Sequence, residues 1–144
     1  MKIGILIIFR NDERAIEVQK LITLFTEKKK LNVCFVNNGS TDNTFELLKE
    51  IQEEASIPIS IIDVKKNRGH QAAIKAGVRY LTSQNDLPYI LCMKQFTSKD
   101  YDCLEKVFNI IQQEKDIVMD VFSKTKRLTH KNVFSLDVVL EKAC

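Results

Sequence analysis

A chain of 144 residues is expected to fold as one domain, residues 1–144, with room for a single hydrophobic core. Apolar residues make up 44% and charged residues 28%, as in an ordinary soluble globular protein, and a scattered net charge of +3 argues against nucleic acid as a partner. The opening apolar run, residues 3–9, is too short to span a membrane and lacks the flanks of a signal peptide.

Alternating apolar runs and helical periodicities follow in chain order. Strands are expected at 3–9, 31–36, 57–64, 89–93 and 116–122. Helices are expected between them, one that opens at 10–13 and others at 45–55, 71–81 and 100–111. This alternation predicts right-handed βαβ units, and therefore an α/β fold: a Rossmann-related three-layer α/β/α sandwich with a mainly parallel sheet.

Two features of the predicted units bear on packing. Small residues recur in the helix at 71–81, at Ala72, Ala73, Ala76 and Gly77, and predict close contact with the sheet. Residues 1–122 are expected to form the core, and residues 123–144 a C-terminal tail. Because the tail contains an apolar patch at 133–140, we expect it to supply an edge strand or a helix, or a dimer contact.

The four cysteines are Cys34, Cys92, Cys103 and Cys144, and no two of them form a C-x-x-C pair. Cys34 and Cys92 fall within apolar strand patterns, so we expect buried free thiols. Neither a zinc site nor a disulfide framework is expected. This cysteine usage is typical of a reducing compartment and predicts a cytoplasmic protein.

Three known nucleotide or phosphate sites can be tested by motif. The turn after the first strand, residues 9–13, contains no glycine and cannot be a dinucleotide-binding G-x-G-x-x-G turn. The chain has no P-loop motif either. A phosphoacceptor receiver would use an acidic pair such as Asp12 and Glu13 with Asp63, but it also needs a lysine that closes strand five, where this chain has Phe122.

Three segments at the ends of predicted strands carry a more specific pattern. Residues 5–13 are a strand with an N-D-E turn, residues 36–44 read V-N-N-G-S-T-D-N-T, and residues 67–77 read N-R-G-H-Q-A-A-I-K-A-G. Together they resemble family 2 glycosyltransferases with the GT-A fold, which carry a D-D-G-S-T-D-x-T segment and an N-x-G-x-x-x-A-x-x-x-G segment. The G-H-Q-A-A run is most similar to the subgroup that transfers sugars to polyprenyl phosphates. The resemblance covers residues 3–120.

The resemblance implies a site for a UDP- or GDP-linked sugar at the carboxyl ends of the strands. Asn37 and Asn38 replace an acidic pair that recognises base and ribose; an amide keeps an acceptor but loses the charge. The alternative for both is that they cap a turn. The residues assigned to this site by the resemblance are Arg10, Asn11, Glu13, Asn37, Asn38, Asp42, Asn67, Arg68, His70 and Lys94.

Three of these residues have a second interpretation that the sequence leaves open. Asp42 can stabilise the free amides at the start of the second helix. Arg68 can hold a phosphate or can be a solvated turn residue. His70 can contact a ligand or can simply begin the third helix.

The family ends its fourth strand with D-x-D, whose carboxylates hold Mn²⁺ or Mg²⁺ against the diphosphate. Here Lys94 and Phe96 stand at those positions. Neither side chain ligates a divalent cation, so no metal site and no cofactor are expected, although Lys94 could itself neutralise a diphosphate. The catalytic residues stay unassigned: Asp137, Glu141 and His130 are the candidates for a general base beyond the fifth strand.

The resemblance implies a truncated glycosyltransferase-like protein, related to enzymes that transfer hexosyl groups from a nucleotide sugar to a lipid or saccharide, with metal-dependent catalysis impaired or lost. The alternative is a non-catalytic binding or assembly partner of an intact glycosyltransferase in polysaccharide or glycolipid synthesis. A homodimer or a partner glycosyltransferase is expected, without nucleic acid and without a transmembrane segment. The expected location is cytoplasmic, peripheral to the inner membrane face.

Overall fold

The computed structural model describes residues 2–84, 86–113 and 132–143. Within them, one parallel sheet of five strands has the order β3-β2-β1-β4-β5. The strands are β1 (Ile3–Phe9), β2 (Leu31–Asn38), β3 (Ile59–Val64), β4 (Ile90–Met93) and β5 (Val133–Ser135). The order changes direction beside β1, and that is where ligands bind in open sheets of this kind.

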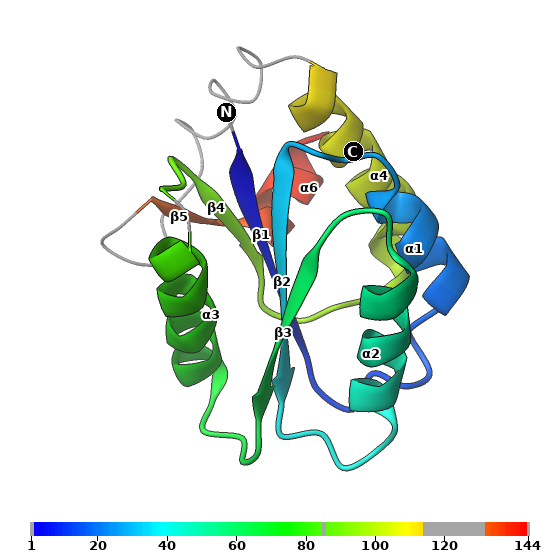
Figure 1. The fold of residues 1–144 in the computed structure, drawn as a ribbon, viewed down its shortest axis with the longest axis vertical. Helices are drawn as coiled ribbons and strands as arrows, with labels where there is room; N and C mark the ends of the chain where they lie inside the picture. Colours follow the sequence, from blue (N-terminus) through cyan, green and yellow to red (C-terminus); the bar gives the residue numbers. More distant parts are fainter. Residues whose placement is uncertain (1, 85, 114–131, 144) are drawn as a thin grey trace.

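Helices cover both faces of the sheet (Figure 1). They are α1 (Val18–Phe25), α2 (Thr44–Glu54), α3 (His70–Gln84), α4 (Tyr101–Gln113) and α6 (Leu136–Ala143), with a short 3-10 helix η1 (Ser98–Asp100) before α4. Among these, α3 packs on one face, while α1, α2, α4 and α6 pack on the other. The predicted α/β sandwich with a parallel sheet is confirmed.

The central strand β1 supplies side chains to both hydrophobic layers. All of its residues are buried, as the continuous apolar sequence predicts for a strand covered on two faces. Ile5, Ile7 and Phe9 point into the layer of α1, α2 and α4. Leu6 and Ile8 point into the layer of α3. Because successive side chains of a strand point to opposite faces, β1 contributes to both hydrophobic layers.

Helix α3 lies close to the sheet because two of its small residues face β1 and β2. A Cβ atom added to Gly77 would lie 2.3 Å from Leu6 Cδ1, closer than real atoms pack. Ala73 is buried as well, whereas Ala72 is exposed and Ala76 half-buried. The predicted close packing is confirmed at Ala73 and Gly77.

The first helix begins later than predicted. The segment 10–13 does not open it, because Asn11 has a φ of 50°, which is not helical, and α1 starts only at Val18. The backbone N–H groups of Asn11 and Asp12 donate to side chains in the loop after β2. Contacts with a distant loop therefore displace the helical geometry that local sequence favours.

The C-terminal segment belongs to the chain's own core. The predicted strand at 116–122 lies outside the described residues, and the edge strand seen beside β4 is β5. Phe134, Leu136 and Val139 are buried with residues of α4, in the hydrophobic layer between the sheet and the helices α1, α2 and α4. Residues 133–140 thus form an edge strand followed by the start of a helix, and their apolar side chains are buried except that of Val138, which is half-buried.

The cysteines are in two states. Cys34 and Cys92 are buried free thiols, as predicted. Cys103 in α4 is disulfide-bonded, a bond that the cysteine spacing, which led us to expect no disulfide framework, does not predict. Cysteine usage therefore no longer argues for a reducing compartment. No helix in the described ranges has the length and apolar character needed to cross a membrane.

Candidate functional site

Polar side chains gather at the carboxyl edge of the sheet, where the loops after β1, β2, β3 and β4 follow their strands (the lower edge of Figure 1). The loops after β1 and β2 are joined by side chains. The Asn11 N–H donates to Ser40 Oγ at 3.0 Å, and Asn11 Oδ1 accepts from the Thr41 N–H at 2.8 Å. Asn43 Nδ2 donates to Glu13 Oε1 at 2.8 Å. Asn11 and Glu13, both predicted as site residues, hold these two loops together.

Asp42 and Thr44 form the buried part of the same contact. Thr44 Oγ1 accepts from the Asp12 N–H at 2.8 Å and donates to Asp42 Oδ1. Asp42 also accepts from the N–H groups of Thr44 and Glu13. Desolvation works against the charged carboxylate, but these hydrogen bonds outweigh it and lower the pKa of Asp42. Asp42 therefore stabilises the first amide of α2, which is the structural role that the sequence allowed.

Asn37, at the end of β2, faces Asp63 on β3. Asn37 is 4% exposed, and its Nδ2 donates to Asp63 Oδ1 at 2.9 Å. Lys65 pairs with the same carboxylate, and this bond is the main reason that the pKa of Asp63 is lowered. Asn37 Oδ1 is buried and has no hydrogen-bond partner among the described residues. A buried carbonyl oxygen without a hydrogen bond costs free energy of folding. The hydrogen bond from Nδ2 to Asp63 therefore orients this amide, although Oδ1 has no bond to match it.

Asn38 joins the loop after β2 to the loop after β3. Its Nδ2 donates to Asn67 Oδ1 at 3.2 Å, and the same oxygen accepts from the Gly69 N–H at 2.8 Å. Gly39 stands between these loops with a φ of 65°, and a Cβ there would lie 2.5 Å from Asn67 N. Only glycine allows such a close approach of two backbones. Asn38 and Asn67 thus fix the turn that leads into α3.

A cavity of about 160 Å³ opens between the end of β1, the segment after β4 and the start of α3. Its lining residues are Ile8, Arg10, Asp12, His70, Lys94 and Gln95, and we call it the basic cavity. Burial raises the pKa of the Asp12 carboxyl; the hydrogen bond from the Arg10 N–H opposes this shift, and the nearby Asp42 charge adds to it. Three of the predicted site residues, Arg10, His70 and Lys94, therefore meet at one place.

The segment after β4 does not fit a divalent cation of the kind the D-x-D motif holds. Met93 is buried, and the Lys94 ammonium repels a cation. Phe96 is only 2% exposed and packs on Phe9 and Tyr101 with ring centroids 5.1 and 5.5 Å apart. Within the described ranges, no group of three or more histidine, cysteine or acidic residues is arranged to hold a metal ion.

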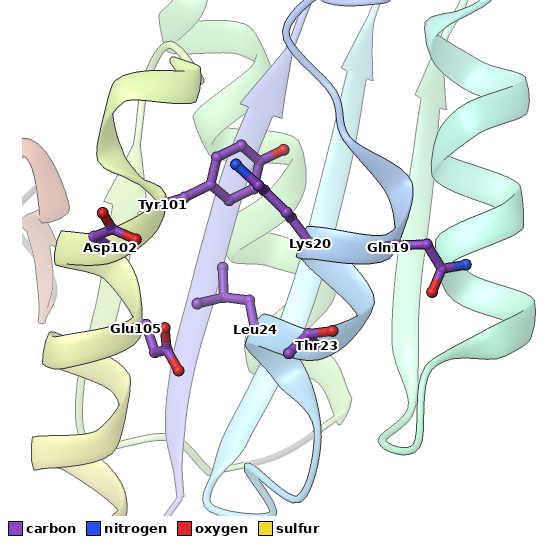
Figure 2. A pocket seen from close by; sticks show the side chains of 7 residues that line it. All are labelled: Gln19, Lys20, Thr23, Leu24, Tyr101, Asp102 and Glu105. Carbon is purple, nitrogen blue, oxygen red and sulfur yellow. The ribbon is translucent and has the colours of Figure 1, made fainter.

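A larger cavity of about 300 Å³ lies between α1 and α4 (Figure 2). It is lined by side chains such as Thr23 and Leu24 of α1 and Asp102 and Glu105 of α4. Lys20 lies 5.4 Å from the centre of the Tyr101 ring. None of the predicted site residues lines this cavity.

The structure sorts the predicted site residues into three sets. Asn11, Glu13 and Asp42 join the loops after β1 and β2; Asn37, Asn38 and Asn67 join β2 to β3 and to the loop after β3; Arg10, His70 and Lys94 line the basic cavity. Arg68 is exposed and does not line the basic cavity. The contact of each with a ligand stays a prediction.

Sequence reasoning missed three residues at this edge. Asp12 and Gln95 line the basic cavity, and Asp63 holds Asn37. A usable signal existed for Asp63, because it stands next to the end of a predicted parallel strand. The sequence at 10–13 predicts the start of a helix there and so gives no signal for Asp12 as a cavity residue.

The fold and its polar carboxyl edge define a GT-A-like α/β domain. The family model described as "Glycosyl transferase family 2" matches residues 5–137. This chain belongs to that family.

Two relatives show how much of a longer protein is matched. An uncharacterized protein of Methanocaldococcus jannaschii is 30% identical over 89 residues, which are 62% of this chain and 37% of the relative. The poly-beta-1,6-N-acetyl-D-glucosamine synthase of Staphylococcus aureus is 31% identical over 94 residues, 64% of this chain and 21% of the relative. The match thus spans between a fifth and two fifths of the length of these relatives.

Proposed function

We propose that this chain binds the nucleotide part of a UDP- or GDP-linked sugar at the carboxyl edge of its sheet, as a glycosyltransferase-like protein whose metal-dependent transfer is impaired or lost. The observation that carries the proposal is the replacement at Lys94 and Phe96. Membership in the family and the polar loops argue for a retained nucleotide site. A cation in place of one carboxylate and a core aromatic ring in place of the other argue against a retained metal.

The residues available at this edge favour binding over chemistry. Asn37 and Asn38 are buried and hold neighbouring loops, so they position the ligand-facing backbone. Arg68 and His70 are exposed at the turn into α3, where a guanidinium can reach a phosphate. A general base for an acceptor hydroxyl is not assigned among these groups.

The name of the Staphylococcus aureus relative suggests the pathway. A synthase of poly-beta-1,6-N-acetyl-D-glucosamine makes an amino-sugar polymer. We propose that this chain acts in polysaccharide synthesis. The competing possibility is a pathway with a lipid acceptor, as in the polyprenyl-phosphate subgroup. In either setting, a chain without transfer activity would act as a binding or assembly partner of an intact glycosyltransferase.

Calorimetric titration of the purified chain with UDP-sugars and GDP-sugars, each with and without Mn²⁺, tests this proposal. Binding of one nucleotide series with little effect of Mn²⁺ is expected. No binding to any nucleotide sugar would favour the assembly role alone, and hydrolysis of a donor by the purified chain would contradict lost catalysis.

A matched pair of variants tests the location of the site. Arg68→Gln removes an exposed guanidinium at the turn into α3, and Arg79→Gln removes another within α3, further from the carboxyl edge. If the phosphates lie near the turn, Arg68→Gln weakens nucleotide binding about tenfold and Arg79→Gln leaves it unchanged. Equal effects of the two variants would show that the phosphates do not contact Arg68.

A further inference from the structure

The basic cavity holds positive side chains that form no salt bridge with the described residues. Within the described part of the chain the salt bridges are Lys20 with Glu17 and Lys65 with Asp63, so Arg10 and Lys94 form none. The carboxylate in the lining is Asp12, which accepts a hydrogen bond from the Arg10 backbone and is partly desolvated. Two permanent cations thus face one carboxylate whose charged form is disfavoured.

The amino end of α3 adds further donors to the same cavity. His70, the first residue of this 15-residue helix, lines the cavity, and no acidic residue occupies the first turn. The backbone N–H groups of His70, Gln71 and Ala72 have no acceptor among the described residues. Free amides at the start of a helix attract anions, because the helix dipole is positive there.

Gly69 leaves the approach to these amides open. It has a φ of 93°, and a Cβ added to it would meet no atom of the described residues within 4 Å. Asn67 Oδ1 fixes this turn by accepting the Gly69 N–H. The backbone is therefore held in a conformation in which a ligand can approach the start of α3 without meeting a side chain at position 69.

The size of the cavity limits what it can take. At about 160 Å³ it is smaller than sites for whole small-molecule ligands, which are on the order of 300–1,000 Å³. It can therefore hold a part of a nucleotide sugar, and its positive charges select the part that is anionic. Lysine and arginine bind phosphate oxygens through short charge-assisted hydrogen bonds without a metal ion.

From these observations we infer that the basic cavity is a metal-independent diphosphate subsite. Lys94 and Arg10 neutralise the phosphate charge there, and the backbone N–H groups at the start of α3 donate hydrogen bonds to the phosphate oxygens. This inference rests on the proposed binding of a nucleotide sugar, and it assigns the diphosphate of that ligand to particular residues. Lys94, which excludes a metal, supplies the positive charge in its place.

The test uses the full chain, titrated with inorganic pyrophosphate and with uridine, UMP and UDP (and the guanosine series) in the presence of EDTA. Lys94→Gln removes the cavity charge. Lys99→Gln makes the same change at an exposed position outside the cavity. We expect Lys94→Gln to weaken UDP or GDP and pyrophosphate about tenfold, with the nucleoside unchanged, and Lys99→Gln to have no effect. In a parallel series without EDTA, added Mn²⁺ is expected to change these affinities less than about twofold.

The outcomes separate this inference from the proposed function. Pyrophosphate binding that depends on Lys94, without binding of any nucleotide, would support the subsite and remove the proposed function. Nucleotide binding that Lys94→Gln does not weaken, or that Mn²⁺ strengthens tenfold, would overturn the subsite and leave nucleotide binding in place. A circular dichroism spectrum equal to that of the wild type is the condition for comparing the variants.

Discussion

The Asn37 amide donates a hydrogen bond of 2.9 Å to the Asp63 carboxylate, at facing positions of β2 and β3. The carboxylate is also paired with Lys65 and has a lowered pKa. Because the Asp63 carboxylate can only accept hydrogen bonds, it orients the Asn37 amide with Nδ2 toward β3. The family's acidic residue at position 37 would instead place a second negative charge against Asp63.

Replacing Asn37 by aspartate should therefore destabilise the protein in a pH-dependent way. Like charges at facing positions of two strands repel, and burial raises the pKa of the new carboxyl above its unfolded value of about 3.9. The loss is expected to be about 2 kcal/mol at pH 7 and to shrink as the pH falls toward 4, where the raised group is protonated. Urea denaturation at both pH values measures it.

Asn32→Asp is the matched control, because Asn32 lies at the opposite end of the same strand and is half-buried. Subtracting its effect removes the pH dependence common to the whole protein. An Asn37→Asp loss that is the same at pH 7 and pH 4 would show that the two side chains do not interact as described.

Thr44 is the second residue on which the carboxyl edge depends. It is fully buried, accepts from the Asp12 N–H and donates to Asp42. Thr44→Val keeps the shape but leaves both partners without this hydroxyl, which we expect to cost about 2 kcal/mol in the free energy of unfolding. Thr44→Ser keeps the hydroxyl and should cost about 1 kcal/mol through its lost methyl group. If denaturant titration shows that Thr44→Ser is less stable than Thr44→Val, this role of the hydroxyl is contradicted.

The strands and the ligand edge could be predicted from sequence because their signals are local. The uninterrupted apolar run of β1 predicts a strand buried on two faces, and the turn residues that follow Val36 mark the end of β2. The small residues at Ala73 and Gly77 predict the close packing of α3. Each of these conclusions depends on residues within one element.

The parts that could not be predicted depend on distant contacts. The late start of α1 is caused by Asn11, whose positive φ is stabilised by Ser40 and Thr41 about thirty residues away. The pairing of Asn37 with Asp63 requires the register of β2 and β3. The sequence shows that Lys94 and Phe96 replace the two carboxylates. It does not show that Lys94 lines a cavity or that Phe96 packs in the core.

The two buried thiols should be chemically silent in the folded protein. Burial raises the pKa of Cys34 to about 12. Burial and the Asp137 charge raise that of Cys92 to about 12, against the opposing effect of Lys94. At pH 8.5 about half of an unperturbed thiol is thiolate, so iodoacetamide should label both cysteines at least about a hundredfold faster in urea than in buffer. Peptide mass spectrometry resolves the two sites.

The same shifts have a consequence for stability at high pH. A thiol whose folded pKa is raised contributes fully below its unfolded pKa of about 8.5, and this contribution is lost as the pH rises toward the folded value. Stability should therefore fall between pH 8.5 and 10, and less steeply in a Cys34→Ala variant. A variant with the same slope as the wild type would exclude Cys34 as a source of this pH dependence.

Restoring the family's two carboxylates should fail at one position and succeed at the other. Lys94→Asp changes a half-buried residue at the cavity and should alter stability by less than about 1 kcal/mol. Phe96→Asp removes a core ring that packs on Phe9 and Tyr101 and buries a charge, so we expect a loss of at least about 4 kcal/mol. Phe96→Leu, which keeps an apolar side chain, separates lost packing from buried charge and should cost about half as much. Denaturation of all three variants with and without Mn²⁺ measures these effects. A stable Phe96→Asp variant that Mn²⁺ stabilises further would show that position 96 can turn outward to a metal, and the metal-independent site would then be wrong.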